Sequence, residues 1–178
     1  MRAPVVTALL LSALQPSVPV WPVSAALLSR SLVSDACRLV TKEEMSAILG
    51  APVTVARPSG APEKDEDSGG MRSDCAYPAA SGAAGYVVVI EFPSPVAAAK
   101  AVNEELVKGM FEGDKAKVVV EPGLGDKAWW GETKEGAQLL VLQGAKAFAV
   151  GAGGPGMGPP SAKHADLHAL AAKAIGRL

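Results

Sequence analysis

The two histidines of the chain are spaced as a pair that could bind a metal ion. His164 and His168 lie four residues apart in a segment with helical periodicity, and this spacing lets two imidazoles reach one ion. A zinc site needs at least three protein ligands, and Asp166 would point to a different side of the helix. We therefore expect the histidines to lie on or beside a solvated face, and we expect no cofactor. Metal carriage through this pair is an alternative.

A second group of residues that could carry out chemistry is the acidic segment that ends at Ser68. A serine hydrolase needs a histidine base within reach of its nucleophile, and both histidines come much later in the sequence. A short run of charges is more often a solvated surface loop. The sequence therefore favours a polar connector, with a hydrolase that uses Ser68 or Asp67 as the alternative.

Two adjacent tryptophans are the most suggestive binding residues. Trp129 and Trp130 lie in an apolar run after the turn formed by Gly123 and Gly125. Neighbouring residues of a strand point to opposite faces, so one indole would enter the core while the other contacts a ligand or partner beside the glycine turn. The alternative places both indoles beneath helices, because tryptophan is usually buried.

The first 25 residues have the features of a secretory signal peptide. Arg2 supplies the positive end, residues 5–14 are apolar, and residues 23–25 offer a small-residue cleavage site. An uncleaved anchor is the alternative, although three prolines between positions 16 and 22 argue against a continuous membrane span. We expect a periplasmic or secreted protein with no stable membrane span after cleavage.

The expected export indicates the oxidation state of the two cysteines. Oxidising compartments favour disulfides, and a chain with two cysteines allows only the pair Cys37–Cys75. Two buried free thiols are the alternative. Residues 26–34 have no clear pattern and form a lead-in, so the sequence predicts one globular domain over residues 35–178.

Charge excludes one class of partner. The formal net charge is −1, and the lysines are spread thinly along the chain. Because no basic stripe is present to neutralise phosphates, we expect no binding to nucleic acid.

The start of the predicted domain encodes a short helix. Thr41 and Glu44 have the spacing of a capping box, and Gly50 can end the helix in the left-handed conformation. Met45, Ile48 and Leu49 share one face. Two helical turns are not stable alone in water, so packing and the disulfide must hold this segment.

The remaining pattern predicts strands that do not alternate with helices. Apolar or alternating runs indicate strands at 53–56, 75–77, 86–92, 118–121, 128–130, 138–142 and 147–150. The run 86–92 is apolar at successive positions, which predicts a central strand covered on both faces. Helices are expected at 94–110, with Ala99, Val102, Leu106 and Met110 buried, and from about 160 to the end. The fold class is therefore α+β, an antiparallel sheet of about seven strands covered by three helices.

Several short motifs together resemble a known group of proteins. They are Cys37-x-Leu39-x-Thr41-x-x-Glu44, Leu49-Gly50-x-Pro52-Val53, Cys75-x-Tyr77 and Gly123-Leu124-Gly125-Asp126-x-Ala128-Trp129. This order resembles small exported bacterial domains of unknown function, many of them actinobacterial envelope lipoproteins. The resemblance implies an α+β fold, the Cys37–Cys75 bridge and a location outside the cytoplasm. It brings no catalytic residues, and this chain lacks the lipidated cysteine of those lipoproteins.

These observations favour an exported, non-catalytic binding or accessory domain of the cell envelope. Its partner would be an unknown small ligand or an envelope protein. We expect it not to be an enzyme, because no complete catalytic set accompanies the well-specified scaffold.

Overall fold

The computed structural model describes residues 34–110 and 117–178. The expected signal peptide, and all but the last residue of the expected lead-in, lie outside them. In chain order the described elements are η2 (Ala36–Arg38), α1 (Lys42–Leu49), β1 (Arg57–Pro58), β2 (Glu63–Lys64), β3 (Met71–Pro78), β4 (Ala84–Glu91), α2 (Pro95–Ala101), α3 (Glu104–Gly109), β5 (Lys117–Glu121), β6 (Lys127–Glu132), β7 (Gly136–Gln143), β8 (Lys146–Gly153), η4 (Pro160–Lys163) and α4 (His164–Ile175).

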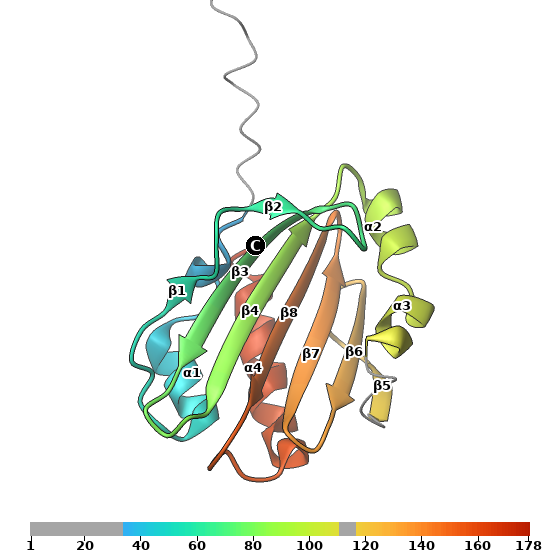
Figure 1. The fold of residues 1–178 in the computed structure, drawn as a ribbon. Helices are drawn as coiled ribbons and strands as arrows, with labels where there is room; N and C mark the ends of the chain where they lie inside the picture. Colours follow the sequence, from blue (N-terminus) through green and yellow to red (C-terminus); the bar gives the residue numbers. More distant parts are fainter. Residues whose placement is uncertain (1–33, 111–116) are drawn as a thin grey trace, which may run out of the picture. The chain divides into compact units, whose positions relative to one another are not determined.

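The strands form one antiparallel sheet. Their order is β1-β3-β4-β8-β7-β6-β5, and β2 pairs separately with β3 (Figure 1). All the pairings between named strands are antiparallel, which confirms the α+β class. Among the described helices, none is both long and apolar enough to cross a membrane.

The first helix forms as its sequence predicts. The Thr41 hydroxyl accepts from the Glu44 backbone N–H at 3.2 Å, and the Glu44 carboxylate accepts from the Thr41 N–H at 3.0 Å. Gly50 ends the helix with φ 66°. Cys37 and Cys75 form the predicted disulfide, with Cα atoms 5.0 Å apart, and thereby tie η2 to β3.

One face of the sheet, here called the covered face, carries the larger core. It is packed beneath η2, α1 and α4, which lie behind the sheet in Figure 1. Its fully buried side chains include Tyr77, Val87, Phe148 and Leu139 from the strands. Leu167, Leu170, Ala171 and Ala174 of α4 are buried against it, as their helical spacing predicts.

The opposite face, here called the outer face, is covered over only part of its area. Helices α2 and α3 pack over β7 and its neighbours toward the β5 edge (Figure 1) and bury a second cluster that contains Trp129 and Leu140. The single helix expected at 94–110 is wrong. Val102 leaves the helical conformation, and Asn103 starts a second helix by accepting from the Leu106 N–H at 2.9 Å.

The break changes which residues of this segment are buried. Ala98, Val102 and Val107 face the sheet, whereas Ala99 and Met110 are exposed and Leu106 is half-buried. The two short helices therefore present a different face from the one that a continuous helix would present, and the second core cluster includes Val107, which the sequence pattern did not single out.

Strand β4 is central, as expected, but it is not covered on both faces. Val87 and Val89 are fully buried on the covered face, whereas Tyr86 on the outer face is 37% exposed. The helices α2 and α3 do not extend over this part of the sheet (Figure 1). The strand expected at 53–56 is also displaced, because Val53 makes only an isolated bridge to Ala79 and β1 follows it.

Candidate functional site: a groove on the outer face

The outer face has small side chains along β8. This strand presents Ala147, Ala149, Gly151 and Gly153 at every second position; Ala147 and Ala149 lie in the cluster beneath α2 and α3, and Gly151 and Gly153 lie beyond it. The neighbouring strand β7 pairs Gly136 with Gly153 and Gln138 with Gly151. Small residues on both strands leave the sheet surface hollow between the larger side chains around it.

Two adjoining hollows follow from this arrangement. One, of about 850 Å³, is lined by Tyr86, Gln138 and the glycine-rich ends of β7 and β8. The other, of about 140 Å³, has an apolar wall that includes Val88, Leu140 and Ala149. Because Met110 and Gln138 line both, the hollows form one depression, here called the outer groove.

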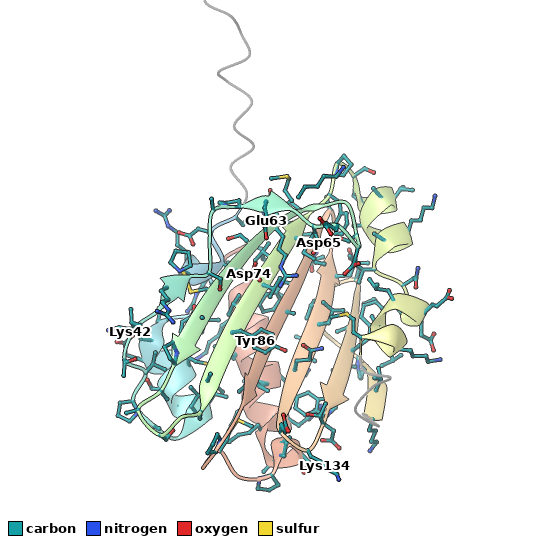
Figure 2. All side chains as sticks on the ribbon, in the orientation of Figure 1. Lys42, Glu63, Asp65, Asp74, Tyr86 and Lys134 are labelled. Carbon is teal, nitrogen blue, oxygen red and sulfur yellow. A yellow bond between two sulfur atoms is a disulfide. The ribbon has the colours of Figure 1, made fainter. Side chains whose placement is uncertain are left out.

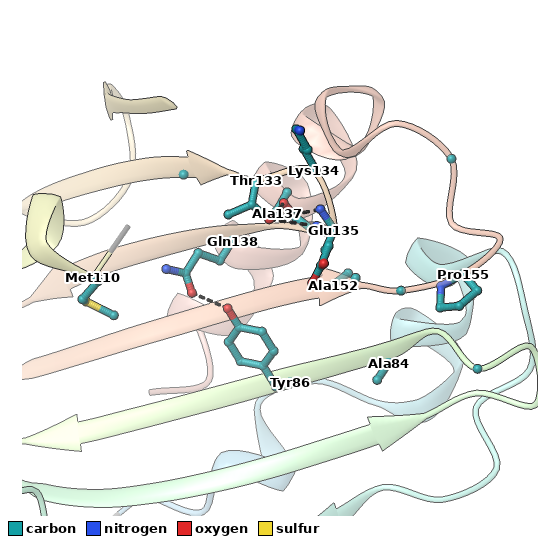
Figure 3. A pocket seen from close by; sticks show the side chains of 16 residues that line it. Ala84, Tyr86, Met110, Thr133, Lys134, Glu135, Ala137, Gln138, Ala152 and Pro155 are labelled. Atoms are coloured by element: carbon teal, nitrogen blue, oxygen red, sulfur yellow. Dashed lines mark hydrogen bonds between the residues drawn. The ribbon is translucent and has the colours of Figure 1, made fainter. Parts of the chain in front are cut away.

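Tyr86 lies at the middle of the groove. It pairs with Gly151 of β8, and Gly151 pairs in turn with Gln138 of β7. A Cβ atom on Gly151 would lie 2.3 Å from the Tyr86 ring, so only glycine lets the ring lie across β8. The Tyr86 hydroxyl thereby reaches Gln138 and donates to its Oε1 (Figure 3).

The electrostatic state of Tyr86 follows from its position on the sheet. Desolvation raises the pKa of Tyr86 to about 12, so the phenol is neutral at physiological pH. Its hydroxyl proton is directed at Gln138, which leaves the phenol oxygen as an acceptor and the Gln138 amide as a donor. The middle of the groove thus offers neutral hydrogen-bonding groups of both kinds.

One end of the groove is bounded by charged side chains that form ion pairs with one another. Arg72 donates to both oxygens of Asp74 at 2.9–3.0 Å and to Asp65 at 3.3 Å. Asp65 also accepts from the Ser68 N–H and hydroxyl at 2.8 and 2.6 Å. Burial would raise the pKa of Asp65, but the hydrogen bonds from Ser68 and Arg72 outweigh it and hold the pKa below its usual value.

The opposite end is formed by the turn between β6 and β7. The Thr133 hydroxyl accepts from the Gly136 N–H at 3.2 Å and orders this turn, while Lys134 and Glu135 project at the rim. Figure 2 shows Tyr86 between the two ends, with Asp65 and Asp74 toward one and Lys134 toward the other. Each end carries both signs of charge, so the groove has no strong preference for an ion.

The tryptophans expected to mark a binding surface are both buried. Trp129 is 1% and Trp130 4% exposed, so the expectation that one indole contacts a ligand is wrong and the alternative holds. The cause is that both faces of β6 are covered. Trp129 packs in the cluster beneath α2 and α3, whereas Trp130 lies in the larger core, edge-on to the His164 ring at 4.7 Å.

The glycine turn beside the tryptophans has a structural role. Gly123 and Gly125 both have positive φ, and a Cβ atom on Gly125 would lie 2.5 Å from the Leu142 carbonyl oxygen. The Asp126 N–H donates to that same oxygen at 2.8 Å. The turn therefore packs closely against the β7–β8 hairpin, and its residues are not part of the lining of the outer groove.

The two histidines share a carboxylate that the sequence did not reveal. His164 Nε2 lies 2.9 Å from one oxygen of Glu121, and His168 Nε2 lies 3.7 Å from the other. Glu121 is 43 residues before His164, and no local pattern connects them. Across the described residues, no group of three His, Cys, Asp or Glu side chains is arranged to hold a metal ion.

The hydrolase alternative required a histidine near Ser68 or Asp67, and the structure separates them. Ser68 and Asp67 line the apolar hollow on the outer face. His164 contacts Trp130, whose ring belongs to the core of the covered face. The sheet lies between the proposed nucleophile and the proposed base.

The small residues of the groove have no reactive side chains, so their residue types did not indicate a site. The alternation of Ala147, Ala149, Gly151 and Gly153 is the signal that could have found them, since four small residues at strand spacing on one face predict a hollow surface. Comparisons with known proteins add nothing to this geometry: no protein-family model matches the chain, and no curated protein matches it.

Proposed function

We propose that this protein is an exported, non-catalytic binding domain that holds a small, elongated ligand in the outer groove. The observation that carries the proposal is the depression of about 850 Å³ on the sheet face that α2 and α3 cover only in part. Ligand sites in proteins are typically concave, with volumes of roughly 300–1,000 Å³ and a few placed polar groups.

The lining indicates the chemistry of the ligand. The smaller hollow is apolar along Val88, Leu140 and Ala149, whereas Tyr86 and Gln138 supply neutral hydrogen-bonding groups beside it. The charges at both ends are of mixed sign, and those of Arg72 are already paired. A neutral amphiphile, with an apolar chain and an uncharged hydrogen-bonding head, fits this distribution best.

The disulfide is a further observation that fits an exported domain. The disulfide and the lack of a long apolar helix in the described part of the chain are compatible with an extracytoplasmic protein. In our proposal the signal at residues 1–25 is cleaved, and the domain meets its amphiphilic ligand in the periplasm or outside the cell.

The test uses monomeric octyl glucoside, a neutral amphiphile, as a probe in isothermal titration calorimetry. Ala149→Leu adds a branched side chain to the wall of the apolar hollow and should weaken binding at least about tenfold. Ala99→Leu makes the same chemical change on the exposed side of α2 and serves as the matched control. Equal affinity of both variants and the unmodified protein, or no binding by any of them, would contradict the proposal.

A further inference from the structure

The two edges of the sheet are built differently. At one edge, β1 has two residues and contains Pro58, and β2 is the two-residue pair Glu63–Lys64. Short strands, proline and charge are the devices by which proteins prevent pairing with a further strand. This edge is therefore blocked.

The other edge is longer and has no proline, and its charged residues stand only at its two ends. Strand β5 pairs with β6 through five consecutive residues without a bulge, and its sequence is Lys-Val-Val-Val-Glu. No described strand pairs with its other side. Val119 is 41% and Val120 54% exposed, so an apolar strand edge faces solvent.

The charges at the ends of β5 make it complementary to itself. If two copies pair antiparallel about a two-fold axis at Val119, Lys117 of each lies directly opposite Glu121 of the other. Directly opposed residues have Cβ atoms roughly 4.5–5.5 Å apart, within reach of an ion pair. A parallel pairing would instead place like charges together, so the sequence selects the antiparallel arrangement.

The Glu121 side chain is 13% exposed at this edge. Its carboxylate contacts only the two imidazoles, and no lysine or arginine within the described ranges lies within ion-pair distance of it. Lys117 is exposed and lies opposite Glu132 of β6, and no ion pair joins these two side chains. Lys117 and Glu121 thus lie on the same face at either end of one apolar edge, and Glu121 is hydrogen-bonded to His164 but to no lysine or arginine of the described residues.

We propose that β5 is a homodimer interface, through which two copies join their sheets antiparallel with Val119 on the two-fold axis. Val118 then lies opposite Val120 on the outer face, and two Lys117–Glu121 pairs close the ends. Five residues a side bury far less than the roughly 1,200 Å² of stable complexes. The association is therefore weak and depends on protein concentration. It does not depend on the outer groove.

Sedimentation velocity of the exported protein over a concentration series tests the proposal. We expect the average mass to rise toward that of two chains. Val119→Lys places two ammonium groups together on the axis and should weaken association at least about tenfold. Val96→Lys is the matched control, because Val96 is 79% exposed on α2. A monomer at all concentrations, or equal dimerisation of both variants, would overturn the proposal.

Charge reversal gives a sharper version of the same test. Lys117→Glu and Glu121→Lys should each abolish self-association, because each places like charges opposite one another. Mixed in equal amounts, the two variants have complementary ends again and should form a heterodimer. Failure of the mixture to associate, with both variants folded by circular dichroism, would overturn the proposal. If Glu121→Lys does not fold, the comparison of Val119→Lys with Val96→Lys decides.

Discussion

The chain has two tyrosines, and they show how differently its two sheet faces are used. Tyr77 on β3 is fully buried on the covered face and donates to the Val40 carbonyl at 2.7 Å. Tyr86 on the adjacent strand β4 is 37% exposed on the outer face and donates to Gln138. One hydroxyl fixes a helix-bearing segment to the sheet, whereas the other organises a groove.

The same contrast extends to the ion pairs. On the covered side, Arg177 near the chain end donates to both Glu44 oxygens at 2.7 and 2.8 Å and to the Leu39 carbonyl at 2.6 Å. These bonds tie the end of the chain to η2 and α1. On the outer face, α2 and α3 cover one part, and Val102 and Leu106 of this segment line the smaller hollow, whereas neither helix contributes to the lining of the larger hollow. The covered face therefore holds the fold, and the outer face is available for binding.

The largest effect should come from the link on the covered face. Replacing both Cys37 and Cys75 by serine removes a cross-link between residues 38 positions apart. The chain-entropy model predicts a loss of about 4 kcal/mol in the free energy of unfolding. Denaturant unfolding measures this loss, and a reductant should affect only the unmodified protein. A loss below about 1 kcal/mol would show that the disulfide is not what holds η2 to β3.

The two tyrosines should give effects of intermediate size: one substitution should lower stability, and the other should lower ligand affinity. Tyr77→Phe removes the donor to a buried carbonyl and should cost about 1–2 kcal/mol of stability with little change in octyl glucoside affinity. Tyr86→Phe should change stability by less than about 0.5 kcal/mol and weaken that affinity. Unfolding and calorimetry on both variants measure the two effects. If the two substitutions have the same profile, the division of roles between the faces is wrong.

The smallest effect concerns pH. Hydrogen bonding to Arg177 lowers the pKa of Glu44 from 4.5 to about 2. A lowered folded-state pKa contributes stability that is present above pH 4.5 and is lost as the pH falls toward 2. A shift of this size corresponds to at most roughly 3 kcal/mol, and because the Arg177 side chain is 35% exposed we expect about 1 kcal/mol.

Glu44→Gln isolates this contribution, because glutamine can keep the capping box but not the charge. The difference in unfolding free energy between the unmodified protein and the variant should be about 1 kcal/mol at neutral pH and should vanish near pH 2. A difference that does not change between these pH values would contradict the ion-pair explanation.

Local chemistry made part of the fold predictable. The capping box at Thr41 and Glu44 joins residues three apart, and the sequence has only one possible disulfide. The long-range partners could not be predicted in this way. Glu44 and Arg177 are 133 residues apart, and neither has a spacing signal that connects it to the other.

The site was harder to predict than the fold for a physical reason. The apolar run in β4 gives no indication of whether a helix covers each of its faces, because Tyr86 and Val87 are both compatible with burial. Coverage depends on where α2 ends, and that depends on the break at Val102 and Asn103. The tryptophans attracted attention by their size, whereas the groove is made by residues that are small.

The most direct test is to find where a neutral amphiphile binds. Amide chemical shifts in ¹H–¹⁵N NMR spectra, recorded while octyl glucoside is added, report the location. The groove predicts that the largest changes occur at Gly136, Gly151 and Gly153, which lie side by side on β7 and β8. Changes concentrated instead at the hollow between α1 and α4, near Ala47 and Ala169, would show that the covered side binds the ligand and would contradict the account.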